Sequence, residues 1–129
     1  MTEKKLTPRP AATLLLLREG PGAPEVFMLQ RTNKAAFLPG AFVFPGGALE
    51  PDDASDRAAR RVRGLDDAQA SARMGLASGG LAYWVAAARE CFEESGILLA
   101  FDENVFPVQS TSSYFQAGCC FKMRKSSSV

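Results

Sequence analysis

Histidine is absent from this chain of 129 residues. Its absence excludes nucleophiles activated by histidine and zinc sites built on imidazole ligands. Proton transfer must therefore fall to carboxylates, lysine or tyrosine. Cysteine is scarce as well: the three cysteines contain no C-x-x-C pair and form no even set for a disulfide framework. We therefore expect reduced cysteines and a cytoplasmic protein.

Long hydrophobic runs and an excess of one charge are also lacking. The apolar run at residues 11–17 is far too short to span a bilayer, and no small-residue cleavage site follows it, so we expect no signal peptide. The formal net charge of +1 gives no field that would favour nucleic acid or a membrane surface. The 47% of hydrophobic residues is typical of a soluble globular protein, and the length suits one domain with one core.

The most informative segment is residues 89–97, which read Arg-Glu-Cys-Phe-Glu-Glu-Ser-Gly-Ile. Residues 81–95 contain no glycine or proline and a glycine follows them, which predicts a helix with a left-handed cap. On that helix Glu90, Glu93 and Glu94 share one face. Their carboxylates repel one another, and a hard cation such as Mg²⁺ or Mn²⁺ would remove the repulsion. A solvated acidic face on a surface helix is the alternative interpretation.

Shorter elements are expected before and after this helix. Four consecutive leucines predict a first strand that is buried on both faces, and the second strand should form a hairpin with it. Pro45-Gly46-Gly47 is expected to turn the chain. We expect strands at residues 11–18, 25–31, 41–44, 48–50 and 97–101, and helices at residues 53–64 and 66–74.

Two motifs together resemble the Nudix hydrolase family. One is Gly46-Gly47, and the other is Arg89-Glu90-x-x-Glu93-Glu94-x-Gly96-Ile97, which keeps every fixed position of the second half of the family's box. Cys91 stands where the family usually has an aliphatic residue.

The first half of the box departs from the family in two ways. Counting five residues on from Gly47 reaches Asp53, where the family has glutamate. Residues 54–88 then separate Asp53 from the second half, 35 residues where the family has seven. We interpret residues 54–78 as an insertion, which resembles a Nudix subgroup that includes coenzyme A diphosphatases.

A second partial resemblance concerns the substrate. Coenzyme A-type Nudix enzymes carry a stretch whose spacing is kept here by Arg31, Gly40 and the run Phe44–Gly47, whereas the second arginine of that stretch falls on Ala36. The resemblance implies that Arg31 binds substrate. A surface charge at a strand end is the alternative interpretation of Arg31.

The resemblance implies an α+β fold, a Nudix-type α/β/α sandwich around a mixed β-sheet. It also implies hydrolysis of a pyrophosphate bond in a nucleoside diphosphate derivative, with coenzyme A or acyl-CoA among the substrates and Mg²⁺ or Mn²⁺ as cofactor. The implied catalytic residues are Arg89, Glu90, Glu93 and Asp53; the implied metal ligands are Glu90, Glu93 and Glu94; the implied substrate-binding residues are Arg31, Gly46 and Gly47.

The domain boundaries follow from composition. We expect a mobile lead at residues 1–9, a Nudix domain at residues 10–109 and an atypical, disordered tail at residues 110–129. Only 32 residues remain from residue 98 onward, so we expect a truncated or altered C-terminus and an incomplete sheet. A truncated, inactive Nudix domain that binds a nucleotide or a protein partner is the alternative function.

The expected insertion carries Arg57, Arg60, Arg61 and Arg63. These arginines could meet substrate phosphates, including an extra phosphate on coenzyme A. The alternative is a solvated basic face paired with the neighbouring Asp66 and Asp67.

Overall fold

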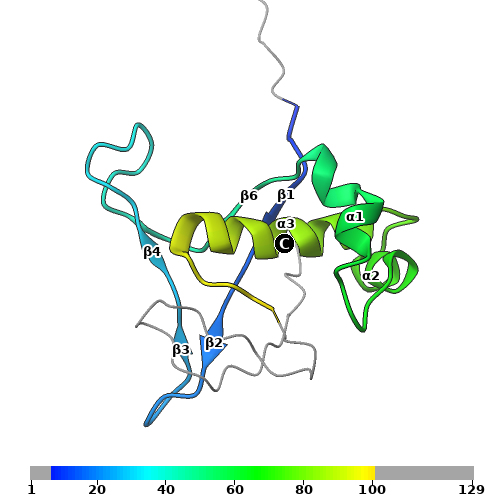
Figure 1. The fold of residues 1–129 in the computed structure, drawn as a ribbon. Helices are drawn as coiled ribbons and strands as arrows, with labels where there is room; N and C mark the ends of the chain where they lie inside the picture. The colour runs from blue at the N-terminus through cyan, green and yellow to red at the C-terminus, as the bar shows by residue number, and fades with distance from the viewer. Residues whose placement is uncertain (1–6, 101–129) are drawn as a thin grey trace, which may run out of the picture.

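The computed structural model describes residues 7–100. In this part of the chain, short strand pairs come first and helices follow (Figure 1). The expected tail at residues 110–129 and most of the expected lead lie outside the described residues. The strands are β1 (Ala11–Thr13), β2 (Leu17–Arg18), β3 (Glu25–Val26), β4 (Leu29–Gln30), β5 (Phe42–Val43) and β6 (Gly46–Ala48).

Strand pairing among the described residues is antiparallel throughout. β1 pairs with β6 so that Ala12 lies opposite Gly47, β2 pairs with β3, and β4 pairs with β5. The pairing of β2 with β3 confirms the expected hairpin. Both of its expected strands are interrupted, because β1 and β2 occupy only the two ends of residues 11–18, and β3 and β4 occupy only parts of residues 25–31.

The leucine run is buried on one face only. Leu14 and Leu16 are each 3% exposed, whereas Leu15 is 47% and Leu17 46% exposed. Side chains in an extended segment alternate between opposite sides, and α3 (Gly80–Ser95) covers one of them. The expectation of a strand buried on both faces is therefore wrong for the described part of the molecule.

Gly46 and Gly47 do not turn the chain. They open strand β6, which pairs with β1 and lies under α3 (Figure 1). The strand expected at residues 48–50 therefore begins two residues earlier and ends at Ala48. A Cβ on Gly46 would collide with the backbone of β1 at Ala12 and Thr13, so close strand approach is the reason for glycine there.

The segment expected to be one helix from residue 53 to residue 64 is divided. The 3₁₀ turn η1 (Pro51–Ala54) is followed by the short helix α1 (Asp56–Ala59). Ser55 has an extended ψ of 152°, which breaks the helix, and its hydroxyl accepts a hydrogen bond from the N–H of Ala58 at 3.2 Å.

The next two helices agree with the sequence. α2 (Asp67–Met74) is capped by Asp66, whose carboxylate accepts from the N–H of Gln69 at 2.8 Å. α3 ends at Gly96, which has the expected left-handed φ of 72°. α3 packs against β1 and β6 and also contacts α2 and η1.

The core lies between α3 and the first strands. Its buried members are Leu14, Leu16, Ala87, Cys91 and Ile97. The strand expected from residue 97 is absent over residues 97–100, and residue 101 lies outside the described residues. No helix within residues 7–100 is both long enough and apolar enough to cross a membrane.

Candidate functional site

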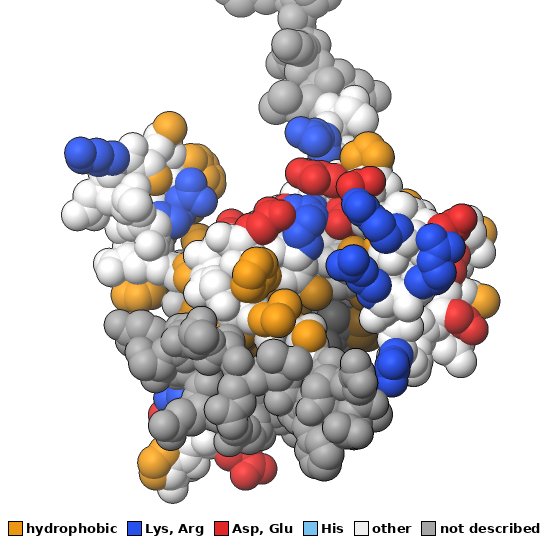
Figure 2. Space-filling model, viewed as in Figure 1, with side chains coloured by type: hydrophobic (Ala, Val, Ile, Leu, Met, Phe, Trp, Pro, Cys, Tyr) orange, Lys and Arg blue, Asp and Glu red, His pale blue; other side chains and the backbone are white. Residues whose placement is uncertain are grey.

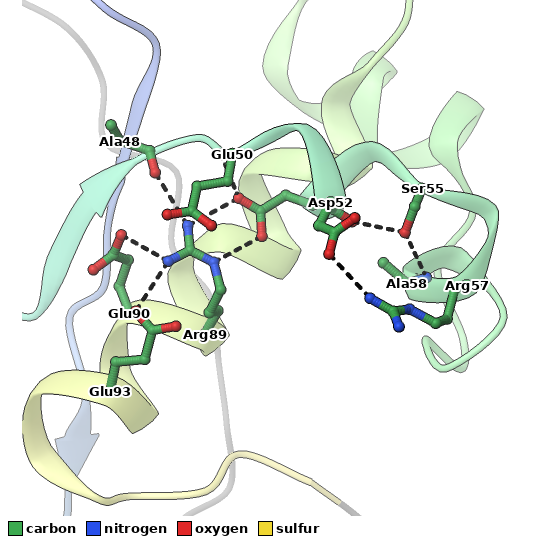
Figure 3. Close-up of polar contacts among 10 residues, drawn as sticks. Ala48, Glu50, Asp52, Ser55, Arg57, Ala58, Arg89, Glu90 and Glu93 are labelled. Atoms are coloured by element: carbon green, nitrogen blue, oxygen red, sulfur yellow. Dashed lines mark hydrogen bonds and ion pairs between the residues drawn. The ribbon is translucent and has the colours of Figure 1, made fainter.

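One arginine, Arg89, joins the long helix to the segments that face it. Its Nε and Nη2 donate to the two carboxylate oxygens of Asp53, each at 2.9 Å. Nη2 also donates to the backbone carbonyl of Ala48 at 3.1 Å. On α3 itself, Nη1 donates to Glu90 at 3.0 Å and to Glu93 at 3.1 Å (Figure 3). We call this set of contacts the Arg89 network.

Asp53 is the buried end of the Arg89 network. It is 3% exposed and also accepts a hydrogen bond from the N–H of Glu50 at 2.8 Å. Burial acts to raise the pKa of Asp53, but the hydrogen bonds from Arg89 and Glu50 outweigh it and hold this pKa below its ordinary value. The same hydrogen bond to Asp53 raises the pKa of Arg89. Asp53 is therefore an ionised anchor for Arg89 with little access to solvent.

Two of the helix carboxylates lie directly against β6. A Cβ on Gly47 would overlap the carboxylate of Glu90, so only glycine leaves that position open. The carboxylate of Glu94 accepts a hydrogen bond from the N–H of Gly46 at 3.1 Å. The two glycines therefore let the strand backbone approach the acidic face of α3.

Glu93 differs from its two neighbours. Its side chain is 54% exposed, and its described contact is the ion pair with Arg89 at 3.1 Å. Within residues 7–100, no three acidic or cysteine side chains lie close enough together to hold an ion as they stand. The donor set nevertheless has the right chemistry, since three carboxylates on adjacent helical turns are ligands that Mg²⁺ and Mn²⁺ prefer.

Cys91 faces away from the acidic residues and into the core. It is fully buried, and burial raises the pKa of its thiol, an effect to which the charge of Glu94 adds and which a hydrogen bond with Ser95 opposes. A thiol held neutral in this way is a packing residue.

The other substrate-binding candidate, Arg31, follows β4 directly. Its side chain is exposed, and its backbone N–H donates to the carbonyl of Ala41 at 2.9 Å. Among the described residues, the side chain of Arg31 has no hydrogen bond or ion pair to the acidic face of α3. Gly40, in the same loop, has a φ of 72°, which explains the glycine at that position.

Two supporting residues escaped the sequence analysis. Asp67 accepts hydrogen bonds from the N–H groups of Gly79 at 2.9 Å and Leu81 at 3.0 Å, so that α2 caps the beginning of α3. Ser71 accepts from the N–H of Gly80 at 2.8 Å. The sequence offered no signal, because local capping patterns describe residues three apart and these partners are nine to fourteen apart.

Two known proteins are similar to this chain in sequence. No family model matches the chain. The chain is 39% identical over 100 residues to acyl-coenzyme A diphosphatase NUDT19 of Xenopus laevis, which covers 62% of this chain and 26% of the relative. It is 35% identical over 124 residues to the protein of the same name from Gallus gallus, which covers 70% of this chain and 32% of the relative.

A solved structure decides the family. The crystal structure of a NUDIX hydrolase from Alicyclobacillus acidocaldarius superposes with a TM-score of 0.59 at 35% identity, covering 81% of this chain and 44% of that one. The chain belongs to the Nudix family. It spans about a quarter to a third of the length of the curated relatives that it matches.

The Nudix chain thus has the α+β fold class that its sequence predicted. Nudix hydrolases generally use divalent metal ions and act on small molecules. The Arg89 network joins Asp53 to Arg89, although 35 residues separate them in the sequence.

Proposed function

We propose that this Nudix chain is part of a pyrophosphohydrolase that cleaves a nucleoside diphosphate derivative, with coenzyme A or acyl-CoA as substrate. The observation that carries the proposal is the Arg89 network, which unites the separated halves of the box in one site. The names of the two NUDT19 relatives support the substrate class. Cys91 is a free, buried thiol, as expected in a reducing compartment. The proposal therefore includes a cytoplasmic location.

In this proposal Glu90, Glu93 and Glu94 hold Mg²⁺ or Mn²⁺. When bound, such an ion supplies a stronger nucleophile from water and neutralises charge on the pyrophosphate oxygens. The exposed ion pair between Glu93 and Arg89 costs little to break, so the Glu93 side chain is free to turn towards its two neighbours.

Arg89 and Asp53 act as positioning residues. The bidentate contact with Asp53 fixes the plane of the guanidinium group, and that plane orients the carboxylate of Glu90 against Gly47. Glu90 is then placed to hold the metal or to take a proton from the attacking water.

Substrate recognition is assigned to Arg31 and the two glycines. The exposed guanidinium of Arg31 can donate two parallel hydrogen bonds to a phosphate. Gly46 and Gly47 leave space beside the acidic face because neither carries a side chain.

The test compares turnover of coenzyme A, a nucleotide sugar and a dinucleoside polyphosphate by one preparation in Mg²⁺ or Mn²⁺. We expect coenzyme A to have the highest kcat/KM, and chelation of the metal to stop its hydrolysis. A clear preference for either other substrate would remove the coenzyme A assignment. Binding without turnover of all three would favour the nucleotide-binding module instead.

A further inference from the structure

Three arginines of the segment that separates the halves of the box form a basic patch. Arg60, Arg61 and Arg63 follow α1 directly, and all three are exposed. Figure 2 shows Lys and Arg side chains gathered over α1 and α2, on the same face as the acidic and basic side chains over η1 and α3. We call Arg60, Arg61 and Arg63 the arginine patch.

The acidic residues nearest in sequence do not neutralise the arginine patch. The carboxylate of Asp66 caps α2, and that of Asp67 accepts from two N–H groups at the start of α3. Asp52 forms its ion pair with Arg57 at 3.0 Å. Asp56 lies one turn before Arg60, but no ion pair joins them. Within residues 7–100, the arginine patch therefore has no carboxylate partner.

The arginine patch is connected to the Arg89 network through η1. Asp53 binds Arg89, and its neighbour Asp52 binds Arg57 on the other side (Figure 3). Arg60 lies seven positions after Asp53, so even a fully extended backbone would place their Cα atoms within roughly 25 Å, and the turns of η1 and α1 shorten that span. η1 and α1 therefore link the Arg89 network to the arginine patch along one face of the molecule (Figure 2).

We propose that the arginine patch binds a phosphate monoester that the nucleotide substrate carries in addition to its pyrophosphate. Guanidinium groups recognise phosphate through paired, charge-assisted hydrogen bonds, and a doubly charged anion relieves the repulsion among three unpaired cations. In coenzyme A this group is the phosphate on the 3′-oxygen of the ribose. The inference rests on the proposed function, because the patch would select among substrates of the same hydrolytic site.

The deciding measurement is binding to the full chain without metal, by isothermal titration calorimetry. Adenosine 3′,5′-bisphosphate and adenosine 5′-monophosphate differ only in the second phosphate. We expect the bisphosphate to bind about tenfold more tightly, the gain from one charge-assisted contact. In the triple variant Arg60→Gln, Arg61→Gln, Arg63→Gln, we expect the two affinities to become equal. An undiminished preference in that variant, or no preference in the parent, would overturn the proposal.

Two control variants test whether the change in affinity comes from the arginine patch itself. Arg57→Gln removes an arginine of the same segment that already has a carboxylate partner, and we expect it to retain the tenfold preference. The single variant Arg61→Gln provides a milder change should the triple variant unfold, and it should lower the preference in part. An equal loss of preference in Arg57→Gln and the triple variant would show a general effect of charge and overturn the assignment.

A hydrolysis assay distinguishes a failure of this inference from a failure of the proposed function. Coenzyme A and 3′-dephospho-coenzyme A are compared with the same preparations in Mg²⁺. We expect the triple variant to lose about tenfold in kcat/KM for coenzyme A and to keep its rate on the dephosphorylated substrate. If the parent hydrolyses neither, the proposed function fails, and the binding ratio still decides the role of the arginine patch.

Discussion

Asp67 in α2 caps the helix that carries the Nudix motif, through hydrogen bonds of 3.0 Å from the N–H of Leu81 and 2.9 Å from that of Gly79. Gly79 occupies the cap position and has no side chain to accept these bonds itself. The segment before α3 is thus a structural support for the site as well as a spacer between the halves of the box.

Removing this support should lower stability. Ser71→Ala deletes the buried acceptor of the Gly80 N–H and should cost about 1 kcal/mol of unfolding free energy. Asp67→Ala, combined with Ser71→Ala, should lower the unfolding free energy and the urea midpoint further. Urea unfolding monitored by circular dichroism measures both, with exposed Asp56→Ala as the control. Equal midpoints for the control and the Ser71 variant would contradict the capping role.

The ion pair between Asp53 and Arg89 should be costly to break. Asp53→Asn removes the buried counter-charge of Arg89 and leaves only its ion pairs with Glu90 and Glu93, so we expect a loss of about 2 kcal/mol in unfolding free energy. The control Asp52→Asn changes the adjacent residue, whose side chain is 77% exposed, and should cost less than about 0.5 kcal/mol. Similar urea midpoints for the two variants would show that the buried pair does not stabilise the fold.

Stability should fall at acid pH. The pKa values of Asp53 and Asp67 are held below the ordinary value of 3.8, so their ionised forms favour the folded state. Their stabilisation is fully present above the unfolded pKa and is lost as pH falls through the lower folded pKa. Melting temperatures measured from pH 6 down to pH 2 should show this loss, and Asp53→Asn should flatten the curve. An unchanged slope in that variant would exclude Asp53 as a source.

Gly47 should tolerate no side chain. In Gly47→Ala the added Cβ meets the carboxylate of Glu90, which must move away from β6. We expect at least a tenfold loss of kcat. The control Gly22→Ala adds the same atom where no heavy atom lies within 4 Å and should leave turnover unchanged. Parent-like turnover in the Gly47 variant would show that Glu90 works equally well in another position.

Divalent metal should stabilise the chain through the acidic face of α3. Mg²⁺ or Mn²⁺ at about 100 times its dissociation constant should add about 2.7 kcal/mol to the unfolding free energy, and chelation should reverse this. Glu94→Gln keeps an oxygen for the N–H of Gly46 but removes the charge, and it should lose most of the rise. Glu19→Gln, in a loop away from α3, is the control. If the Glu94 variant responds to metal as the parent does, these glutamates form only a solvated acidic surface and do not bind the ion.

Features that depend on neighbours in the sequence were determined by the sequence itself. The length of α3 follows from an unbroken run of helix-forming residues, and its end follows from Gly96 in a left-handed conformation. The cap of α2 by Asp66 follows from a pattern three residues long. The hairpin of β2 and β3 and the spacing of the second half of the box belong to the same class.

Features that depend on contacts between distant residues were decided only by the tertiary structure. Asp53 and Arg89 are 36 residues apart, and their pairing depends on the fold that brings η1 to α3. Gly46 and Gly47 form a strand where the sequence predicted a turn, because they pair with the distant strand β1, and Gly47 also closely approaches Glu90. Hydrogen bonds and burial act over a few ångströms in space, whatever the separation along the chain, so no local pattern could have predicted them.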